Sequence, residues 1–195
     1  MTSSHPLSVP SISRWLRNYY VLRAGVSMLW IALAVSIGIH DPAVGALLLV
    51  AYPAWDAFAN YLDARRSGGL RNSPPQLLNT VVSIIAALAL GWALTRGMST
   101  AIKVFGGWAI FAGVLQLVTA VRRWKTAGGQ WAMVLSGAQS AAAGVFFFKQ
   151  ATSGIPLNVA TVAPYAGLGA VYFLISAIWL QRALFKSQSS TDGPT

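Results

Sequence analysis

Five long stretches of the chain contain no Asp, Glu, Lys or Arg. They cover residues 24–40, 72–95, 104–121, 126–148 and 150–181. A helix needs roughly 20 mostly apolar residues to cross the hydrocarbon core of a bilayer, so each stretch can hold at least one span. Only 9% of the residues are charged, whereas soluble domains average about 25%. Because so few charges cannot cover the surface of a soluble domain, the sequence predicts an all-α integral membrane protein.

The uncharged stretches and their flanks predict six transmembrane helices. Their expected limits are about 19–38, 42–63, 77–95, 100–121, 130–149 and 157–181. The stretch 151–156 separates the last two helices, because its glycine and proline interrupt helical structure. Together the helices form a membrane domain over 19–186, and the first is expected to be retained rather than cleaved as a signal peptide. Residues 1–18 are expected to form a polar cytoplasmic tail with an interfacial anchor, and 187–195 a disordered cytoplasmic tail.

Successive connections between the predicted helices lie on opposite faces of the membrane, which gives two sets of helix ends. The basic residues behind the net charge of +10 are distributed unequally between these two sets. Eleven of the 14 basic residues flank one set: Arg14, Arg17, Arg23, Arg65, Arg66, Arg71, Arg122, Arg123, Lys125, Arg182 and Lys186. The opposite set has Arg96, Lys103 and Lys149. Since cytoplasmic loops retain Lys and Arg, this asymmetry predicts that both termini are cytoplasmic. The expected partners of the basic ends are the lipid bilayer and its anionic headgroups, at roughly 1 kcal/mol per charge, and nucleic acid is not expected.

The chain repeats itself with a period of about 56 residues. The odd-numbered helices begin with the equivalent segments 22–27, 78–83 and 134–139. The even-numbered helices end alike, at Ala64-Arg65-Arg66, Val121-Arg122-Arg123 and Leu180-Gln181-Arg182. Each period therefore predicts a helical hairpin of the same orientation. The predicted repeats are parallel and cover about 19–72, 73–128 and 129–186.

This combination of spans, period and basic ends resembles the HdeD-like acid-resistance membrane proteins, a family with six spans in three short repeats. The residues that match the family's pattern, over 19–186, are Gly25, Pro42, Asp56, Gly107, Gly113, Gly137, Gly144 and Gly167. The chain departs from that pattern at Ala57, Val81 and Met98. The resemblance implies a bacterial inner-membrane protein linked to acid stress, with no established biochemical activity.

Pairs of small residues spaced i, i+4 recur in the predicted helices. They are Ala87/Gly91, Ala109/Gly113, Ser136/Ser140, Ser140/Gly144 and Ala163/Gly167. Helices in lipid associate through close packing, which small residues allow, so these pairs are expected to serve packing rather than a ligand site. The oligomeric state, a homo-oligomer included, stays open.

Asp56 is an acidic residue inside a predicted span. It lies about two helical turns from the cytoplasmic edge, roughly 10 Å at 1.5 Å per residue. An aspartate near the centre of a membrane helix costs about 2.5–3.5 kcal/mol on insertion scales, so its presence indicates a specific role. Three interpretations stay open: an ion pair with Arg23, a protonated and hydrogen-bonded carboxyl group, and a proton or cation relay.

Further polar side chains are expected in the cytoplasmic half of the bundle. Asn60 lies one turn from Asp56 on the same helix face. Hydrogen bonds between membrane helices average about 0.6 kcal/mol, which is enough to fix their register. The candidate intramembrane polar site comprises Asp56, Arg23, Asn60, Asn79, Gln116 and Gln139.

His40 and Asp41 lie together in the first predicted external turn. Both side chains can take up a proton on acidification, so this turn is a candidate pH-responsive element. The alternative is that Asp41 caps the second helix and Pro42 starts it, since aspartate and proline are favoured at those positions.

No group of residues in the sequence indicates catalysis. The chain has no cysteine and no glutamate, and its two histidines fall on opposite sides of the predicted membrane, so no metal, cofactor or catalytic site is expected. The sequence predicts a non-enzymatic multi-pass inner-membrane protein that acts in acid or envelope stress. The alternative is a small proton-coupled transporter or permease that uses Asp56 with Arg23.

Overall fold

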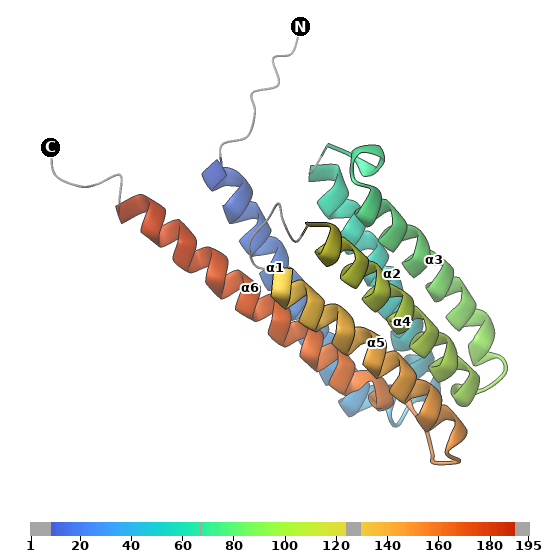
Figure 1. The fold of residues 1–195 in the computed structure, drawn as a ribbon. Helices are drawn as coiled ribbons and strands as arrows, with labels where there is room; N and C mark the ends of the chain where they lie inside the picture. The colour runs from blue at the N-terminus through green and yellow to red at the C-terminus, as the bar shows by residue number, and fades with distance from the viewer. Residues whose placement is uncertain (1–8, 67, 124–129, 190–195) are drawn as a thin grey trace, which may run out of the picture. The chain divides into compact units, whose positions relative to one another are not determined.

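The computed structural model describes residues 9–66, 68–123 and 130–189, and every regular element in these ranges is helical (Figure 1). The α-helices are α1 (Val9–Leu33), α2 (Pro42–Arg66), α3 (Pro74–Leu94), α4 (Met98–Arg123), α5 (Gln130–Thr152) and α6 (Ala163–Ser189). Three short elements, π-helical η1 (Ala34–Gly38) and the 3-10 turns η2 (Leu70–Asn72) and η3 (Val159–Val162), lie between them. The all-helical prediction is therefore confirmed for the described part of the chain.

Five helical segments are long and apolar enough to cross a membrane, judged by length and composition. They are Arg14–Gly38, Pro42–Arg66, Pro74–Leu94, Met98–Val118 and Val159–Phe185. Helix α5, the fifth expected span, is of comparable length, but its side chains are described only from Val134 onward, and the five segments are drawn from described residues alone.

Large and small apolar residues are distributed in the opposite way from a soluble protein. Alanine is the commonest buried apolar residue, whereas Leu88 is 72% exposed, Phe111 64% and Trp179 70%. Large apolar side chains exposed in such numbers indicate a surface that does not face water. Small residues inside and large ones outside suit a bundle whose helices pack closely and face lipid.

Several helix boundaries differ from the expectation, and α6 begins at Ala163 rather than at about 157, after the 3-10 turn η3. Helix α1 begins at Val9, inside the segment expected to be a polar tail. The rings of Trp15 and Tyr19, one turn apart, stack with centroids 5.2 Å apart, which supports helical structure in this segment. Helix α6 continues to Ser189, so residues 187–189 of the expected disordered tail are helical, and 190–195 lie outside the described residues.

The chain divides into two compact units, which are described separately. The first comprises Met1–Leu29 and Ala166–Thr195, and the second comprises Trp30–Tyr165. In the second unit, α2 packs on α3, α3 on α4, and α4 most extensively on α5 (Figure 1). The arrangement as three parallel hairpin repeats stays a prediction.

Helices α4 and α5 approach each other backbone to backbone at two pairs of glycines. A Cβ atom on Gly113 would lie 2.5 Å from the carbonyl oxygen of Gly137, and one on Gly106 would lie 2.8 Å from that of Gly144. The two pairs are seven residues apart on each helix, and a seven-residue spacing returns to nearly the same helix face. The contact is therefore antiparallel and needs glycine at these positions.

The first residues of α2 are held by Asp41. Its Oδ1 accepts hydrogen bonds from the backbone nitrogens of Ala43 at 2.8 Å and Val44 at 3.2 Å. These amides begin the helix and have no partner within it. The capping interpretation of Asp41 and Pro42 is thus supported by the geometry.

Replacing Asp41 by alanine is expected to lower the free energy of unfolding by about 1 kcal/mol, because the two amides lose their acceptor. Unfolding of the purified protein in mixed detergent–lipid micelles measures this. Asp41→Asn, which keeps a side-chain oxygen, should remain close to the unmodified protein. Equal losses for both variants would show that the cap does not stabilise α2.

Candidate functional site

Asp56 lies on α2, half-buried, and its carboxyl group has donors from two helices. Oδ2 accepts a hydrogen bond from Ser83 Oγ of α3 at 2.9 Å and another from Asn60 Nδ2 at 3.0 Å. Asn60 Nδ2 also lies 2.8 Å from the backbone carbonyl oxygen of Asp56, one helical turn away. Asn60 of the same helix and Ser83 of α3 thus both contact the Asp56 carboxyl group.

Ser83 connects Asp56 to a third helix. Trp108 Nε1 of α4 donates a hydrogen bond to Ser83 Oγ at 3.0 Å, and Ser83 Oγ donates in turn to Asp56. Ser83 is 2% exposed and Trp108 is 5% exposed. A buried donor without an acceptor costs about 1–3 kcal/mol, so each member of this series needs the next. The series links α4, α3 and α2 through polar groups in an apolar interior.

A second polar contact joins α2 and α3 nearer to their connection. Gln76 Nε2 donates a hydrogen bond to Asp63 Oδ2 at 3.0 Å. Asp63 follows Asp56 by seven residues and Gln76 precedes Ser83 by seven, so the two contacts are two turns apart in an antiparallel helix pair. Between these two contacts, α2 carries Asn60 and α3 carries Asn79. We term the whole set the polar seam: Asp56, Asn60, Asp63, Gln76, Asn79 and Ser83.

Aromatic rings fill the other side of Asp56, toward the start of α2. The aromatic cluster consists of Trp30, Tyr52, Phe105, Trp108, Phe147 and Tyr165. Phe105 is fully buried, and its ring centroid lies 5.1 Å from that of Trp108 and 5.6 Å from that of Phe147. Tyr52, one turn before Asp56, lies 5.8 Å from Phe105. These distances are those of rings in direct contact.

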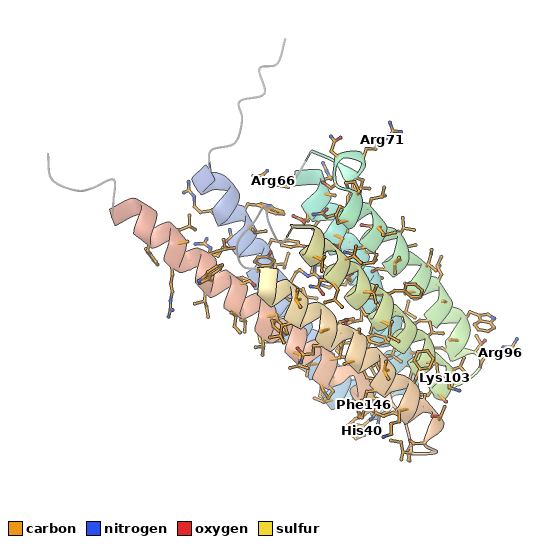
Figure 2. The ribbon with its side chains drawn as sticks, viewed as in Figure 1. His40, Arg66, Arg71, Arg96, Lys103 and Phe146 are labelled. Atoms are coloured by element: carbon orange, nitrogen blue, oxygen red, sulfur yellow. The ribbon has the colours of Figure 1, made fainter. Side chains whose placement is uncertain are left out.

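The second unit has basic residues at both ends, and the polar seam approaches one of them. Arg66 and Arg71 lie at the end where α2 passes to α3, whereas His40, Arg96 and Lys103 lie toward the opposite end (Figure 2). Asp63 and Gln76 are the seam residues nearest to that first end, since they are closest in sequence to the connection. The other seam residues lie farther from this end, first the two asparagines and then Asp56 and Ser83.

Arg23 belongs to the first unit, and Asp56 belongs to the second. Within its own unit, the Arg23 guanidinium carbon lies 4.3 Å from the ring centroid of Phe173. Its Nη1 donates a hydrogen bond to the Tyr19 hydroxyl at 3.2 Å. A cation over an aromatic face is a favourable arrangement for an arginine near an apolar phase. The ion pair between Arg23 and Asp56 stays a prediction.

The other predicted polar residues occupy two different helix contacts. Asn79 is half-buried on α3, within the polar seam. Gln116 Nε2 of α4 donates a long hydrogen bond, 3.4 Å, to Ser136 Oγ of α5. Gln139 is half-buried on α5. The candidate intramembrane polar site is therefore not a single cluster, because Gln116 belongs to the contact between α4 and α5.

His40 and Asp41 are both exposed in the turn between η1 and α2. The backbone nitrogen of His40 donates to the carbonyl oxygen of Ile37 at 2.9 Å, which closes the end of the π-helical turn. The Asp41 carboxyl group serves as the cap described above. A pH-responsive role for this turn stays a prediction.

Two parts of the site are absent from the sequence predictions. The contact between Asp63 and Gln76 could have been found, because the seven-residue spacing of Asp56 and Asp63 repeats between Gln76 and Ser83. The hydrogen bond from Trp108 has no such signal. Periodicity places an indole in the interior but does not indicate which hydroxyl group its N–H meets.

The centre of the chain matches a known repeat. Residues 77–149 match the family described as a short repeat of unknown function, DUF308. That repeat is the one found in HdeD-like membrane proteins. No curated protein and no solved structure matches the chain.

The matched range runs from α3 through α4 into α5. It contains the glycines of the α4–α5 contact together with Ser83 and Trp108, whereas Asp56 lies outside it. The match and the long apolar helices together indicate a multi-pass membrane protein of unknown function.

Proposed function

We propose that this protein is a non-enzymatic, multi-pass protein of the bacterial inner membrane that acts in the response to acid or envelope stress, as its resemblance to HdeD-like proteins suggests. In this proposal Asp56 is a structural residue. The observation that carries this role is the series of hydrogen bonds from Trp108 to Ser83 and from Ser83 to Asp56, which uses the carboxyl group to hold three helices together.

The proposed orientation has both termini in the cytoplasm. Arg66 and Arg71 would then lie among the cytoplasmic headgroups, and His40 would face the periplasm (Figure 2). The excess of Lys and Arg among the helix ends on the cytoplasmic side supports this orientation and a preference for anionic lipids. Close packing through small residues also suits a homo-oligomer, whose existence is part of the proposal.

The second candidate is a small proton-coupled transporter in which Asp56 works with Arg23. One observation favours it: the polar seam leads from one end of the second unit to Asp56. The aromatic cluster favours the structural role, because a conducting path would have to pass through tightly packed rings.

Survival of the native bacterium under acid and envelope stress tests the proposal. Deleting the gene is expected to lower survival, and restoring either the unmodified gene or Asp56→Asn should recover it, provided that both proteins accumulate equally. Loss of recovery in Asp56→Asn at normal abundance would support the transporter instead. Survival of the deletion strain at the level of its parent would contradict a stress function.

A further inference from the structure

The polar seam has a direction. Its polar residues begin with Asp63 and Gln76 near the connection of α2 to α3, continue with the two asparagines, and end at Asp56 and Ser83. The charged groups of the seam are the carboxyl groups of Asp56 and Asp63, both on α2. From α3, the Gln76 amide group donates to Asp63 and the Ser83 hydroxyl group donates to Asp56.

The carboxyl and amide residues of the seam are partly exposed along its whole length. Asp63, Gln76 and Asp56 are half-buried, and among the seam residues only Ser83 is buried, at 2% exposed. Carboxyl and amide groups retain favourable energy only where donors, acceptors or water surround them, since a polar group in hydrocarbon costs several kcal/mol, roughly, when unsatisfied. The partial exposure of these carboxyl and amide groups is therefore the arrangement expected of a hydrated surface.

Gln76 provides a second and independent observation. Its Nε2 is bonded to Asp63, but its Oε1 has an accessible area below 1 Å² and no donor among the described residues. A buried acceptor of this kind is normally satisfied by a water molecule, since buried waters occupy sites with several polar partners. The Asp63 carboxyl group, bonded to the same side-chain amide, supplies one such partner.

The deep end of the seam is closed. Tyr52 lies one turn beyond Asp56, and its ring centroid is 5.9 Å from that of Trp108 and 5.1 Å from that of Trp30. Phe105 is fully buried behind them. The Trp30 indole N–H already bonds to the Leu48 carbonyl oxygen, and the Tyr165 hydroxyl group bonds to Ser140. The packed ring faces between these groups offer water no partner, so the path ends at the cluster.

We propose that the polar seam is a one-sided aqueous access path. Water enters between α2 and α3 at the end that carries Arg66 and Arg71, reaches Asp56, and stops at the aromatic cluster. Asp56 is therefore accessible to the aqueous phase on one side of the membrane only. This inference rests on the proposed insertion in a membrane, but it does not depend on a role in stress.

The chain has no cysteine, so single cysteines can report water access without any background. Thiols react as thiolates, which form in water and are suppressed in an apolar interior. Asn60→Cys and Asn79→Cys place the probe in the seam. Ala86→Cys lies seven residues beyond Asn79, on the same face of α3 but buried past the closed end. Ile85, the residue before Ala86, is 60% exposed, and a cysteine at this position is expected to face lipid.

The four variants are reconstituted in sealed vesicles and treated from each side with a charged, membrane-impermeant methanethiosulfonate. Asn60→Cys and Asn79→Cys should react from the Arg66 side at least ~100-fold faster than Ala86→Cys. Burial in an apolar interior raises the pKa of a thiol and so lowers the fraction present as the reactive thiolate. Neither asparagine variant should react from the opposite side. Arg71→Cys is the control that identifies the Arg66 side. Size-exclusion chromatography identifies variants that do not fold, and Gln76→Cys then replaces them as the probe in the seam.

The outcomes separate the possible failures. Protection of both asparagine positions from either side would show a dry seam and overturn the proposal. Modification of Ala86→Cys, or of the asparagine positions from the opposite side, would overturn one-sided access. Rapid modification of Ile85→Cys would instead contradict membrane insertion, which is a failure of the proposed function.

Discussion

Gly113→Ala is expected to destabilise the protein by about 3 kcal/mol, at the upper end of the range for overpacking. The added Cβ would lie 2.5 Å from the Gly137 carbonyl oxygen and 2.6 Å from the Ala141 backbone nitrogen. Both neighbours are backbone atoms, so no side chain can rotate away and α4 must separate from α5. Since helix association in lipid depends on close packing, separation at one point weakens the whole contact. Unfolding in mixed detergent–lipid micelles measures the loss.

Gly107→Ala is the matched control on the same helix. A Cβ atom there would meet no atom within 4 Å, and alanine is favoured over glycine in a helix by up to about 1 kcal/mol. This variant should therefore be as stable as the unmodified protein or slightly more stable. Equal destabilisation of Gly107→Ala and Gly113→Ala would contradict the glycine contact between α4 and α5.

Ser83→Ala is expected to cost about 2 kcal/mol, because it removes two buried hydrogen bonds at once. Trp108 Nε1 loses its acceptor and Asp56 Oδ2 loses a donor. In a bundle of this size the melting temperature should fall by roughly 4–8 °C. Thermal unfolding in the same micelles, followed by circular dichroism, gives both quantities.

Two further variants show whether the loss belongs to the hydrogen-bonded series. Ser36→Ala removes an exposed hydroxyl group that bonds only to the local carbonyl oxygen of Ala32, and it should change stability by less than about 0.5 kcal/mol. Combining Ser83→Ala with Trp108→Phe should cost about 1 kcal/mol less than the sum of the single losses, because both break the same bond. Strict additivity would mean that the indole N–H and the hydroxyl group are not coupled.

The helices are the part of the fold that the sequence predicts best. Hydrocarbon thickness requires a minimum length of uncharged, apolar chain, and that requirement is visible residue by residue. The ends are less accurate, as α1 shows by beginning at Val9. The segment that contains Trp15 and Tyr19 is less apolar than the part of α1 that follows it, so composition alone does not locate where the helix begins.

The contacts between helices were predicted only in part. The resemblance included Gly107, but Gly106 makes the contact with α5. Adjacent glycines differ by 100° around a helix, and composition alone does not reveal which of them faces the neighbour. Asn60 was found as a partner of Asp56 because both lie on one helix, whereas Ser83 and Trp108 depend on the register between helices.

The pairing of Arg23 with Asp56 stays a prediction, but the other contacts of these two residues could not be predicted from the sequence. An arginine and an aspartate near the same membrane face suggest an ion pair, since an isolated charge in lipid is costly. The structure gives each residue local partners, a ring of Phe173 for Arg23 and a hydroxyl group of Ser83 for Asp56. Sequence reasoning considers charges first and has no comparable rule for aromatic or hydroxyl partners.

Proton flux across sealed proteoliposomes tests most directly whether Asp56 is a structural residue. With a pH gradient imposed, vesicles containing the unmodified protein and vesicles containing Asp56→Asn should both lose the gradient no faster than protein-free vesicles. Asp56→Asn should also melt roughly 2–4 °C lower, as expected for weakening of the bonds to the carboxyl group by about 1 kcal/mol. A proton or solute flux in the unmodified protein that Asp56→Asn abolishes would contradict the structural role and establish transport.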